Sequence, residues 1–287
     1  MAVSKVLLYP NINKKSCLDA LDVVSDKLHS LGIRTIMSVE TQKVVGKDNI
    51  KADEYLPVRS AFESCDIAVI LGGDGTMLTA AHTACITGTP LLGINLGTLG
   101  YMSELEIGEL SLLDKLNSGF EYADRMMIDI TIEQGGTESN KLTALNDALI
   151  SRGAVSSMVR LSLNCDGSRV ANYRADGLII STPTGSSAYC MSAGGPIIDT
   201  KLDAFCVVPI CSHSLSGSRA LVFSPNSVIT VQSVSEKGGD LILTADGRFS
   251  VPLTESDRVI ITKSKLKTRF VKLKKDAFYD ALNRKLI

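Results

Sequence analysis

In the first third of the chain, short apolar runs alternate with segments in which apolar residues recur at helical spacing. Short apolar runs at 6–9, 33–39, 67–71 and 90–95 are bounded by turn residues, and such runs predict buried strands. Between the first two runs, leucine and valine recur at helical spacing up to Gly32, which predicts a helix that ends there. Alternation of strands with helices indicates parallel strands joined by crossover helices, and hence an open α/β sheet.

The pattern changes after about Arg125 to closely spaced, short strand signals. They fall at 127–133, 142–150, 159–164, 170–173, 177–182, 204–210, 221–223, 228–234, 241–245 and 259–262. One helix is predicted among them, near 186–193. Frequent short strands with turn signals predict an all-β sandwich.

These patterns predict a fold of the class α/β plus all-β. An open Rossmann-like α/β domain at 1–124 precedes a β-sandwich domain at 125–264, and the tail at 265–287 returns to the first domain. Ligands of open α/β sheets bind at the carboxyl ends of strands.

Composition narrows the possible functions. The chain has 287 residues, 45% hydrophobic and 21% charged, with a net charge of −1. This balance argues against a broad nucleic-acid surface. The N-terminal segment before the first apolar run is too short for a signal peptide, and no apolar run approaches the length of a transmembrane span. We therefore expect a cytoplasmic protein with no membrane partner. The seven cysteines include no C-x-x-C pair and the three histidines are far apart, so we expect no structural metal site.

The strongest candidate for chemistry directly follows the apolar run at 67–71. It is a turn of three glycines, one carboxylate and one hydroxyl, namely Gly72, Gly73, Asp74, Gly75 and Thr76. Glycines allow positive φ and close approach of a ligand, and N–H groups at a helix start bind anions. A carboxylate repels phosphate unless it handles a hydroxyl proton or a metal ion, so the turn points to phosphoryl transfer with Asp74 near the accepting hydroxyl or Mg²⁺. The alternative is a plain strand–helix turn in which Asp74 caps the helix.

Three further polar segments each admit two interpretations. The loop at 95–101 is either a second wall of the phosphate site or an ordinary connection. Asn146 and Asp147 either bind ribose hydroxyls or stand in water at a strand end. The segment at 176–189 reads as a strand, a hydroxyl-rich loop and a helix start. Its small residues either cap that helix or contact a nucleoside, with Tyr189 packing on the base.

Taken together, these segments resemble the NAD kinase family. Residues 72–76 match its GGDGT loop, 95–101 its NxGxLGF segment, and 176–189 its DGLIISTPTGSTAY stretch, while 194–197 and 209–215 resemble GGPI and PICPHSL. The chain departs from these patterns at a few positions: Tyr101, Ala175, Ser187, Ser212 and Arg248.

The resemblance implies transfer of a phosphoryl group from ATP or polyphosphate to the 2′-hydroxyl of the adenosine ribose of NAD. It implies that Asp74 activates that hydroxyl, that the residues around it (Gly72, Gly73, Gly75 and Thr76) cradle phosphates, and that Asn146 and Asp147 hold the riboses. It further implies that the adenine pocket is lined by Ser187, Ala188, Tyr189 and Ser192. Asp176 and Cys211 would lie near the nicotinamide or the neighbouring subunit.

The same resemblance implies a divalent cation, Mg²⁺, that arrives with the nucleotide, and a homodimer or homotetramer. A substrate that touches residues of both domains would have to lie between them. The nearest rival interpretations are a lipid kinase of the diacylglycerol or sphingosine type and a non-catalytic dinucleotide-binding regulator. The sequence leaves open ATP or polyphosphate as donor, and NAD or NADH as acceptor.

Overall fold

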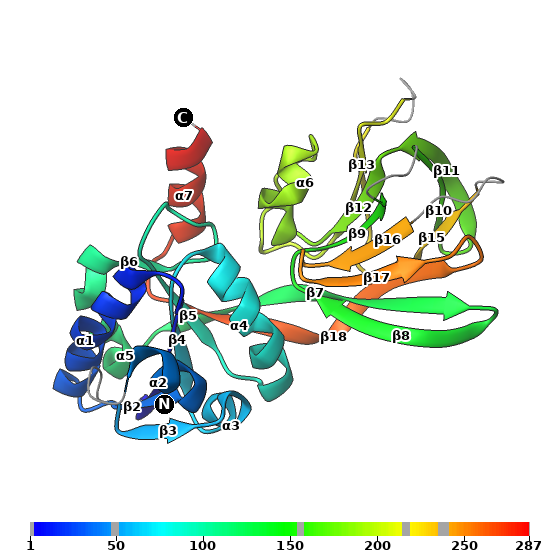
Figure 1. Ribbon diagram of the computed structural model, residues 1–287. Helices are drawn as coiled ribbons and strands as arrows, with labels where there is room; N and C mark the ends of the chain where they lie inside the picture. Colours follow the sequence, from blue (N-terminus) through cyan, green and yellow to red (C-terminus); the bar gives the residue numbers. More distant parts are fainter. Residues whose placement is uncertain (1–2, 47–51, 154–157, 214–218, 235–240, 287) are drawn as a thin grey trace. The chain divides into compact units, whose positions relative to one another are not determined.

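The chain is described here from a computed structural model that covers residues 3–46, 52–153, 158–213, 219–234 and 241–286. It divides into two compact units (Figure 1). Unit 1 comprises Met1–Asp124 and Thr268–Ile287, and unit 2 comprises Arg125–Lys267. Two long strands, β7 (Glu121–Gln134) and β18 (Arg258–Lys272), each run from one unit into the other.

Unit 1 is built on a parallel sheet. Its strands are β1 (Lys5–Pro10), β2 (Arg34–Ser38), β3 (Glu54–Leu56), β4 (Ile67–Leu71), β5 (Leu91–Asn95) and the short β6 (Leu105–Glu106). They are ordered β3-β2-β1-β4-β5, and β6 pairs with the end of β5. The order reverses between β1 and β4, and the crevice at such a switch point is where open α/β sheets bind ligands.

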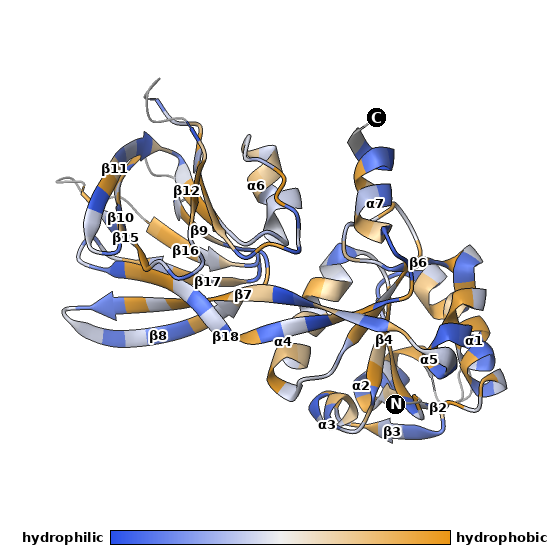
Figure 2. Ribbon diagram, turned by 180° about the vertical axis from the view of Figure 1, so that it is seen from behind, coloured by the Kyte–Doolittle hydropathy of each residue, from blue (hydrophilic) through white to orange (hydrophobic). Residues whose placement is uncertain are grey.

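Helices cover both faces of this sheet. They are α1 (Lys15–Ser30), α2 (Val39–Val45), α3 (Val58–Glu63), α4 (Asp74–Thr87), the 3-10 helix η1 (Ile107–Asp114), α5 (Lys115–Ser118) and α7 (Ala277–Leu286). Helix α1 packs with η1 on one face, whereas α3 packs with α4 on the other (Figure 1). The apolar side of α1 buries Leu21, Val24 and Leu28 against Val6 and Val69, and the central strands are correspondingly hydrophobic (Figure 2).

Unit 2 is a β-sandwich. Its six-stranded antiparallel sheet has the order β14 (Leu221–Phe223), β13 (Phe205–Ile210), β12 (Gly177–Ser181), β9 (Asp147–Arg152), β16 (Leu241–Ala245) and β17 (Phe249–Leu253). The opposing layer contains β8 (Thr137–Ala144), β7, β18, β15 (Ile229–Ser233), β10 (Val159–Cys165) and β11 (Ser168–Ala175). Side chains of both layers, such as Leu163 and Val231 from one and Ile150 and Ile180 from the other, form one buried core.

The outer face of the six-stranded sheet is also covered, by the turn η2 (Gly185–Ser187) and the helix α6 (Tyr189–Ser192). A second buried cluster lies there and includes Ile179, Cys190, Ile198, Cys206 and Val208. Strand β12 is therefore buried on both faces, which explains why its sequence is a continuous apolar run rather than an alternating one.

The structure corrects two predictions about local elements. The run at 142–150 is not one strand, because β8 ends at Ala144 and β9 begins at Asp147. The helix predicted near 186–193 is interrupted at Ala188, whose φ of −103° and ψ of −128° are not helical. The short elements α2, β3 and α3, and the terminal helix α7, were not predicted.

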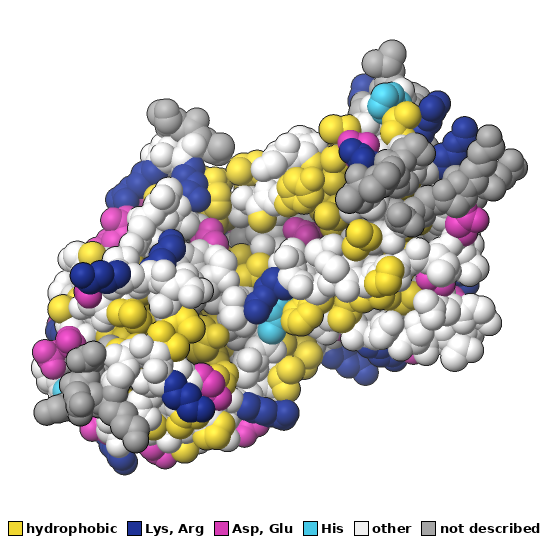
Figure 3. Space-filling model, in the orientation of Figure 1, with side chains coloured by type: hydrophobic (Ala, Val, Ile, Leu, Met, Phe, Trp, Pro, Cys, Tyr) yellow, Lys and Arg dark blue, Asp and Glu magenta, His cyan; other side chains and the backbone are white. Residues whose placement is uncertain are grey.

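Charged side chains of both signs are interspersed over the face that Figure 3 shows. Within the part of the chain that the structure describes, no helix is long and apolar enough to span a bilayer. Among the same residues, no group of three or more His, Cys, Asp or Glu side chains is placed to hold a metal ion.

Candidate active site

The glycine-rich turn connects β4 to α4, with Gly73 preceding the helix and Asp74 as its first residue. The expected use of the glycines is wrong in one respect, because none of Gly72, Gly73 and Gly75 has a positive φ. A Cβ on Gly72 would lie 2.5 Å from Thr76 Oγ1, so Gly72 is needed for packing. A Cβ on Gly73 or Gly75 would meet nothing within 4 Å. Among the described residues nothing requires glycine at these two positions sterically, and the open space beside them leaves room for a ligand.

A cavity of about 380 Å³ opens beside this turn, at the switch point of the unit 1 sheet. Its lining comes from the end of β1 with the segment that follows it, and from the start of α4 with the residue before it. It consists of Tyr9, Pro10, Asn11, Ile12, Asn13, Lys14, Gly73, Gly75, Thr76 and Thr79. The first N–H groups of a helix have no partner within it and favour anions. With the cation of Lys14 on the same wall, the cavity suits a chain of phosphates.

Asn11 joins the two loops that form the cavity. Its backbone N–H donates to Leu71 O at 2.8 Å, and its Nδ2 donates to Thr76 Oγ1 at 3.2 Å. Asn11, Asn13 and Lys14 were not predicted as site residues, because they belong to no glycine motif. They could have been predicted from their position at the carboxyl end of the first predicted strand.

Asp74 is held by a different loop from the one that carries it. Its Oδ2 accepts the backbone N–H of Tyr101 at 2.8 Å, and its Oδ1 accepts that of Met102 at 3.0 Å. A Cβ on Gly100 would overlap Asp74 Oδ1, so this close approach requires glycine. The carboxylate is therefore not a cap of its own helix. The loop at 95–101 contributes to the site by fixing Asp74.

In unit 2, Asn146 and Asp147 lie at the bend between β8 and β9 and are only 7% and 6% exposed. The alternative that placed both in water is wrong. The bend is held by the buried carboxylate of Asp246, which accepts the backbone N–H groups of Leu145 at 2.8 Å, Asn146 at 2.7 Å and Asp147 at 3.2 Å. Asp246 lies in the β16–β17 turn, with a φ of 53°.

The hydroxyl-rich segment after β12 holds the same bend from the other side. Thr182 N donates to Asn146 O at 2.8 Å, and Thr182 Oγ1 donates to Leu145 O at 2.6 Å. Gly185 packs so closely that a Cβ there would overlap Asn146 O. These contacts fix the backbone of Asn146, whereas its buried side-chain oxygen Oδ1 has no hydrogen-bond partner in the part of the chain that the structure describes. A buried acceptor without a partner is costly, and a hydroxyl donor from a ligand would satisfy it.

Asp147 is electrostatically unusual. Burial, and secondly the nearby carboxylate of Asp246, raise the pKa of Asp147 to about 7. Its carboxyl can therefore hold a proton near neutral pH and can both donate and accept hydrogen bonds. Such a group suits the paired hydroxyls of a sugar.

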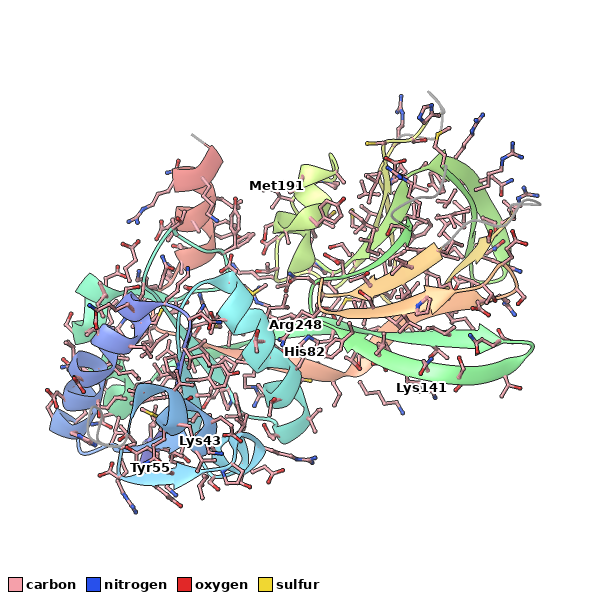
Figure 4. All side chains as sticks on the ribbon, in the orientation of Figure 1. Lys43, Tyr55, His82, Lys141, Met191 and Arg248 are labelled. Atoms are coloured by element: carbon pink, nitrogen blue, oxygen red, sulfur yellow. The ribbon has the colours of Figure 1, made fainter. Side chains whose placement is uncertain are left out.

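The other predicted site residues of unit 2 form two groups. Ser187, Ala188, Tyr189 and Ser192 belong to the η2–α6 segment, which also carries Met191 (Figure 4). Tyr189 is 46% exposed and Ser187 Oγ donates to Thr184 O at 3.2 Å. Asp176 and Cys211 lie together at the ends of β12 and β13, because Asp176 N donates to Ile210 O at 2.9 Å.

The remaining predicted residues of unit 2 lie near the ends of its strands. Asp176 also pairs with Arg152 Nε at 3.0 Å, and Cys211 is an exposed free thiol with a φ of 47°. Arg248, labelled in Figure 4, follows the β16–β17 turn that carries Asp246. Residues 214 and 215 of the predicted motif lie outside the described part of the chain.

An anion-binding cavity next to a fixed carboxylate is what the predicted phosphoryl transfer requires. Comparison with known proteins identifies the family. Residues 23–119 match the family model for the ATP-NAD kinase N-terminal domain, and residues 145–273 match that for the ATP-NAD kinase C-terminal domain. The NAD kinase of Desulforamulus reducens is 41% identical over 82% of this chain and 81% of its own length. That of Caldanaerobacter subterraneus is 37% identical over 99% of both chains. The chain belongs to the NAD kinase family.

Solved structures support the fold. A yeast NADH kinase, crystallised with NADH, matches with a TM-score of 0.85 at 24% identity, over 100% of this chain and 88% of the yeast chain. An NAD kinase from Archaeoglobus fulgidus, in complex with ATP, matches with a TM-score of 0.74 at 23% identity over 98% of both chains. The family assignment confirms an enzyme of the kinase class, and neither the lipid kinase nor the non-catalytic regulator is supported.

Proposed function

We propose that this protein transfers the terminal phosphoryl group of Mg-ATP to the 2′-hydroxyl of the adenosine ribose of NAD, forming NADP and ADP. The observation that carries the proposal is the placement of Asp74. A carboxylate held by two backbone N–H groups starts the helix that lines a cavity shaped for phosphates. Phosphate binding alone has no use for a repulsive negative charge, whereas activation of a hydroxyl requires one.

The donor is assigned to the cavity in unit 1. The ammonium of Lys14 and the N–H groups of the first turn of α4 would bind its phosphate oxygens, and Gly73 and Gly75 leave the space for them. Mg²⁺ enters as part of the substrate Mg-ATP. It would neutralise charge on the β- and γ-phosphates and keep several of its waters.

Asp74 is assigned to the accepting hydroxyl. It would accept the proton of the 2′-hydroxyl as the oxygen bonds to the γ-phosphorus and the bond from phosphorus to the ADP oxygen breaks. The two N–H donors fix the orientation of the carboxylate, and each oxygen keeps a further lone pair for the substrate.

Residues of unit 2 are assigned to the dinucleotide. Asn146 Oδ1 and the Asp147 carboxyl would pair with ribose hydroxyls, since both are buried and the amide oxygen has no partner. Ser187, Ala188, Tyr189 and Ser192 are assigned to the adenine, with the exposed ring of Tyr189 packing on the base. Asp176 and Cys211 are assigned to the nicotinamide or to a second subunit of a homodimer or homotetramer.

An end-point assay tests the proposal and its finer points together. Purified protein is incubated with NAD or NADH and with Mg-ATP or Mg-polyphosphate, and NADP or NADPH is quantified with an NADP-specific dehydrogenase. Formation of NADP from NAD and Mg-ATP is expected, and the other three combinations define the donor and acceptor range. Absence of the 2′-phosphorylated product from every combination would contradict the proposal.

A further inference from the structure

The loop that fixes Asp74 lies between β5 and β6 and is tied at two places to the last segment of the chain. Figures 1 and 2 both draw the terminal helix α7 beside β6, and Arg284 of α7 pairs with Glu106 of β6 at 2.6 Å. The whole arrangement lies within unit 1.

The first tie is Glu104. It is 6% exposed, and its carboxylate accepts the ammonium of Lys272 and the backbone N–H groups of Leu273 at 2.7 Å and Lys274 at 2.6 Å. A buried carboxylate with three donors fixes both segments firmly, because moving either would leave charge buried without a partner.

The second tie is Tyr101. Its ring lies 3.9 Å from the ammonium of Lys285 and 6.4 Å from the ring of Phe278, and both partners belong to α7. The backbone N–H of the same residue donates to Asp74. Tyr101 thus contacts the terminal helix through its side chain and the candidate catalytic carboxylate through its backbone.

The loop around Asp74 has little room to move. Gly100 packs against Asp74 Oδ1 with no room for a Cβ, and a Cβ on Gly93 would lie 2.9 Å from the Cα of Ser103. A loop confined in this way cannot shift by an ångström without breaking the hydrogen bonds from Tyr101 and Met102. Displacements of that size in a catalytic group lower rates by roughly 10²-fold.

We propose that the C-terminal segment 272–285 is a positioning device for Asp74, acting through Glu104 and through the Lys285–Tyr101 contact. Lys285 and Glu104 are positioning residues, since neither is assigned a contact with substrate. The effect on turnover rests on the proposed role of Asp74, whereas the effect on the loop does not.

The test uses the full chain with substitutions at Lys285. Lys285→Ala removes the cation over the ring, Lys285→Arg keeps one, and Asn283→Ala is the matched control because Asn283 is an exposed residue of the same helix. We expect Lys285→Ala to lower kcat by roughly three- to tenfold with KM for both substrates and Tm nearly unchanged. Lys285→Arg should restore kcat, and Asn283→Ala should match wild type.

Hydrogen exchange supplies a readout that does not depend on activity. We expect the amides of Tyr101 and Met102 to exchange roughly tenfold faster in Lys285→Ala than in wild type or Asn283→Ala. Glu104→Gln, which keeps the shape and removes the charge, should accelerate the same two amides. Unchanged exchange in both variants would overturn the positioning proposal, whatever the wild type catalyses.

The activity measurements distinguish the positioning proposal from the proposed function. If wild type forms NADP but Lys285→Ala retains full kcat, the positioning proposal is wrong and the proposed function stands. If exchange accelerates as expected but wild type forms no NADP, the function is wrong and the loop coupling stands. A fall in Tm in Lys285→Ala with full kcat per folded molecule would show a structural role only and would also overturn the proposal.

Discussion

The carboxylate of Asp246 accepts the backbone N–H of Asn146 at 2.7 Å, across 100 residues of sequence. The same carboxylate accepts the N–H groups on either side, so one side chain in the β16–β17 turn determines the bend between β8 and β9. The backbone at the bend is thus held in place, whereas Asn146 Oδ1 is buried and finds no hydrogen-bond partner among the described residues.

We predict that Asp246→Ala lowers the free energy of unfolding by roughly 2–4 kcal/mol, since three buried N–H groups lose their acceptor. Urea denaturation measures this. Asp203→Ala is the control, because Asp203 makes an exposed ion pair with Lys263 at 2.6 Å, and such pairs contribute at most about 1 kcal/mol. Equal stability of the two variants would contradict the role of Asp246.

The raised pKa of Asp147 predicts a pH dependence of stability. The folded-state pKa is about 7, above the ordinary value, so between about pH 4 and 7 the folded protein binds more protons than the unfolded chain. The contribution of Asp147 is therefore fully present below pH 4 and is lost as pH rises through 7. Asp147→Asn cannot ionise, and we expect it to be more stable than wild type by roughly 1–3 kcal/mol at pH 8, with the difference much reduced at pH 5. A constant difference between the two pH values, measured by urea denaturation, would argue against a buried carboxyl with a raised pKa.

Gly73→Ala tests whether the open space beside the turn belongs to a ligand. A methyl group there meets nothing within 4 Å and φ is −98°, so we expect the Tm of the variant to match wild type. KM for ATP should nevertheless rise roughly tenfold or more, because the methyl group occupies space assigned to phosphate. Gly108→Ala, which is equally unobstructed but outside the cavity, is the control. Unchanged kinetics in Gly73→Ala would remove this turn from the donor site.

Lys14→Ala tests the electrostatic part of the same cavity. Loss of the cation should raise KM for Mg-ATP by roughly three- to tenfold, with little change in NAD affinity. The neighbouring Lys15 is also exposed but does not line the cavity, so Lys15→Ala should behave as wild type. The effect of Lys14→Ala should also shrink at high salt, since exposed charges are screened. Identical KM values for the two variants would contradict the assignment of Lys14.

Much of the architecture could be predicted from apolar patterning. The strand at 67–71 and the strands at 221–223 and 241–245 have the predicted boundaries, because each is a short apolar run with turn residues beyond its end. Only the first of the three is buried throughout. Helix α7 was missed although Asp276, directly before it, is of a residue type that often caps helices. The run at 142–150 was predicted as one strand because the acceptor that bends it, Asp246, is remote in sequence.

The candidate site, too, could be predicted only where local motifs mark it. Local motifs were enough to select Asp74, Asn146 and Asp147. They could not show that Asp74 is held by Tyr101 and Met102, or that Asn11 joins the loops after β1 and β4, because these contacts depend on which strands are neighbours. The glycines stay predicted phosphate-binding residues. Of the two reasons given for them, positive φ is wrong, whereas packing accounts for Gly72 and the space beside Gly73 and Gly75 leaves room for a ligand.

The proposed role of Asp74 in phosphorylating NAD is tested by the rate of 2′-phosphorylation with wild type and with Asp74→Asn, measured with γ-labelled Mg-ATP and with the position of the new phosphate determined by NMR. We expect phosphate on the 2′-oxygen in wild type, and a kcat lowered roughly 10²-fold or more in a folded Asp74→Asn variant. No labelled NADP from wild type, or a near-normal kcat in Asp74→Asn, would contradict that role.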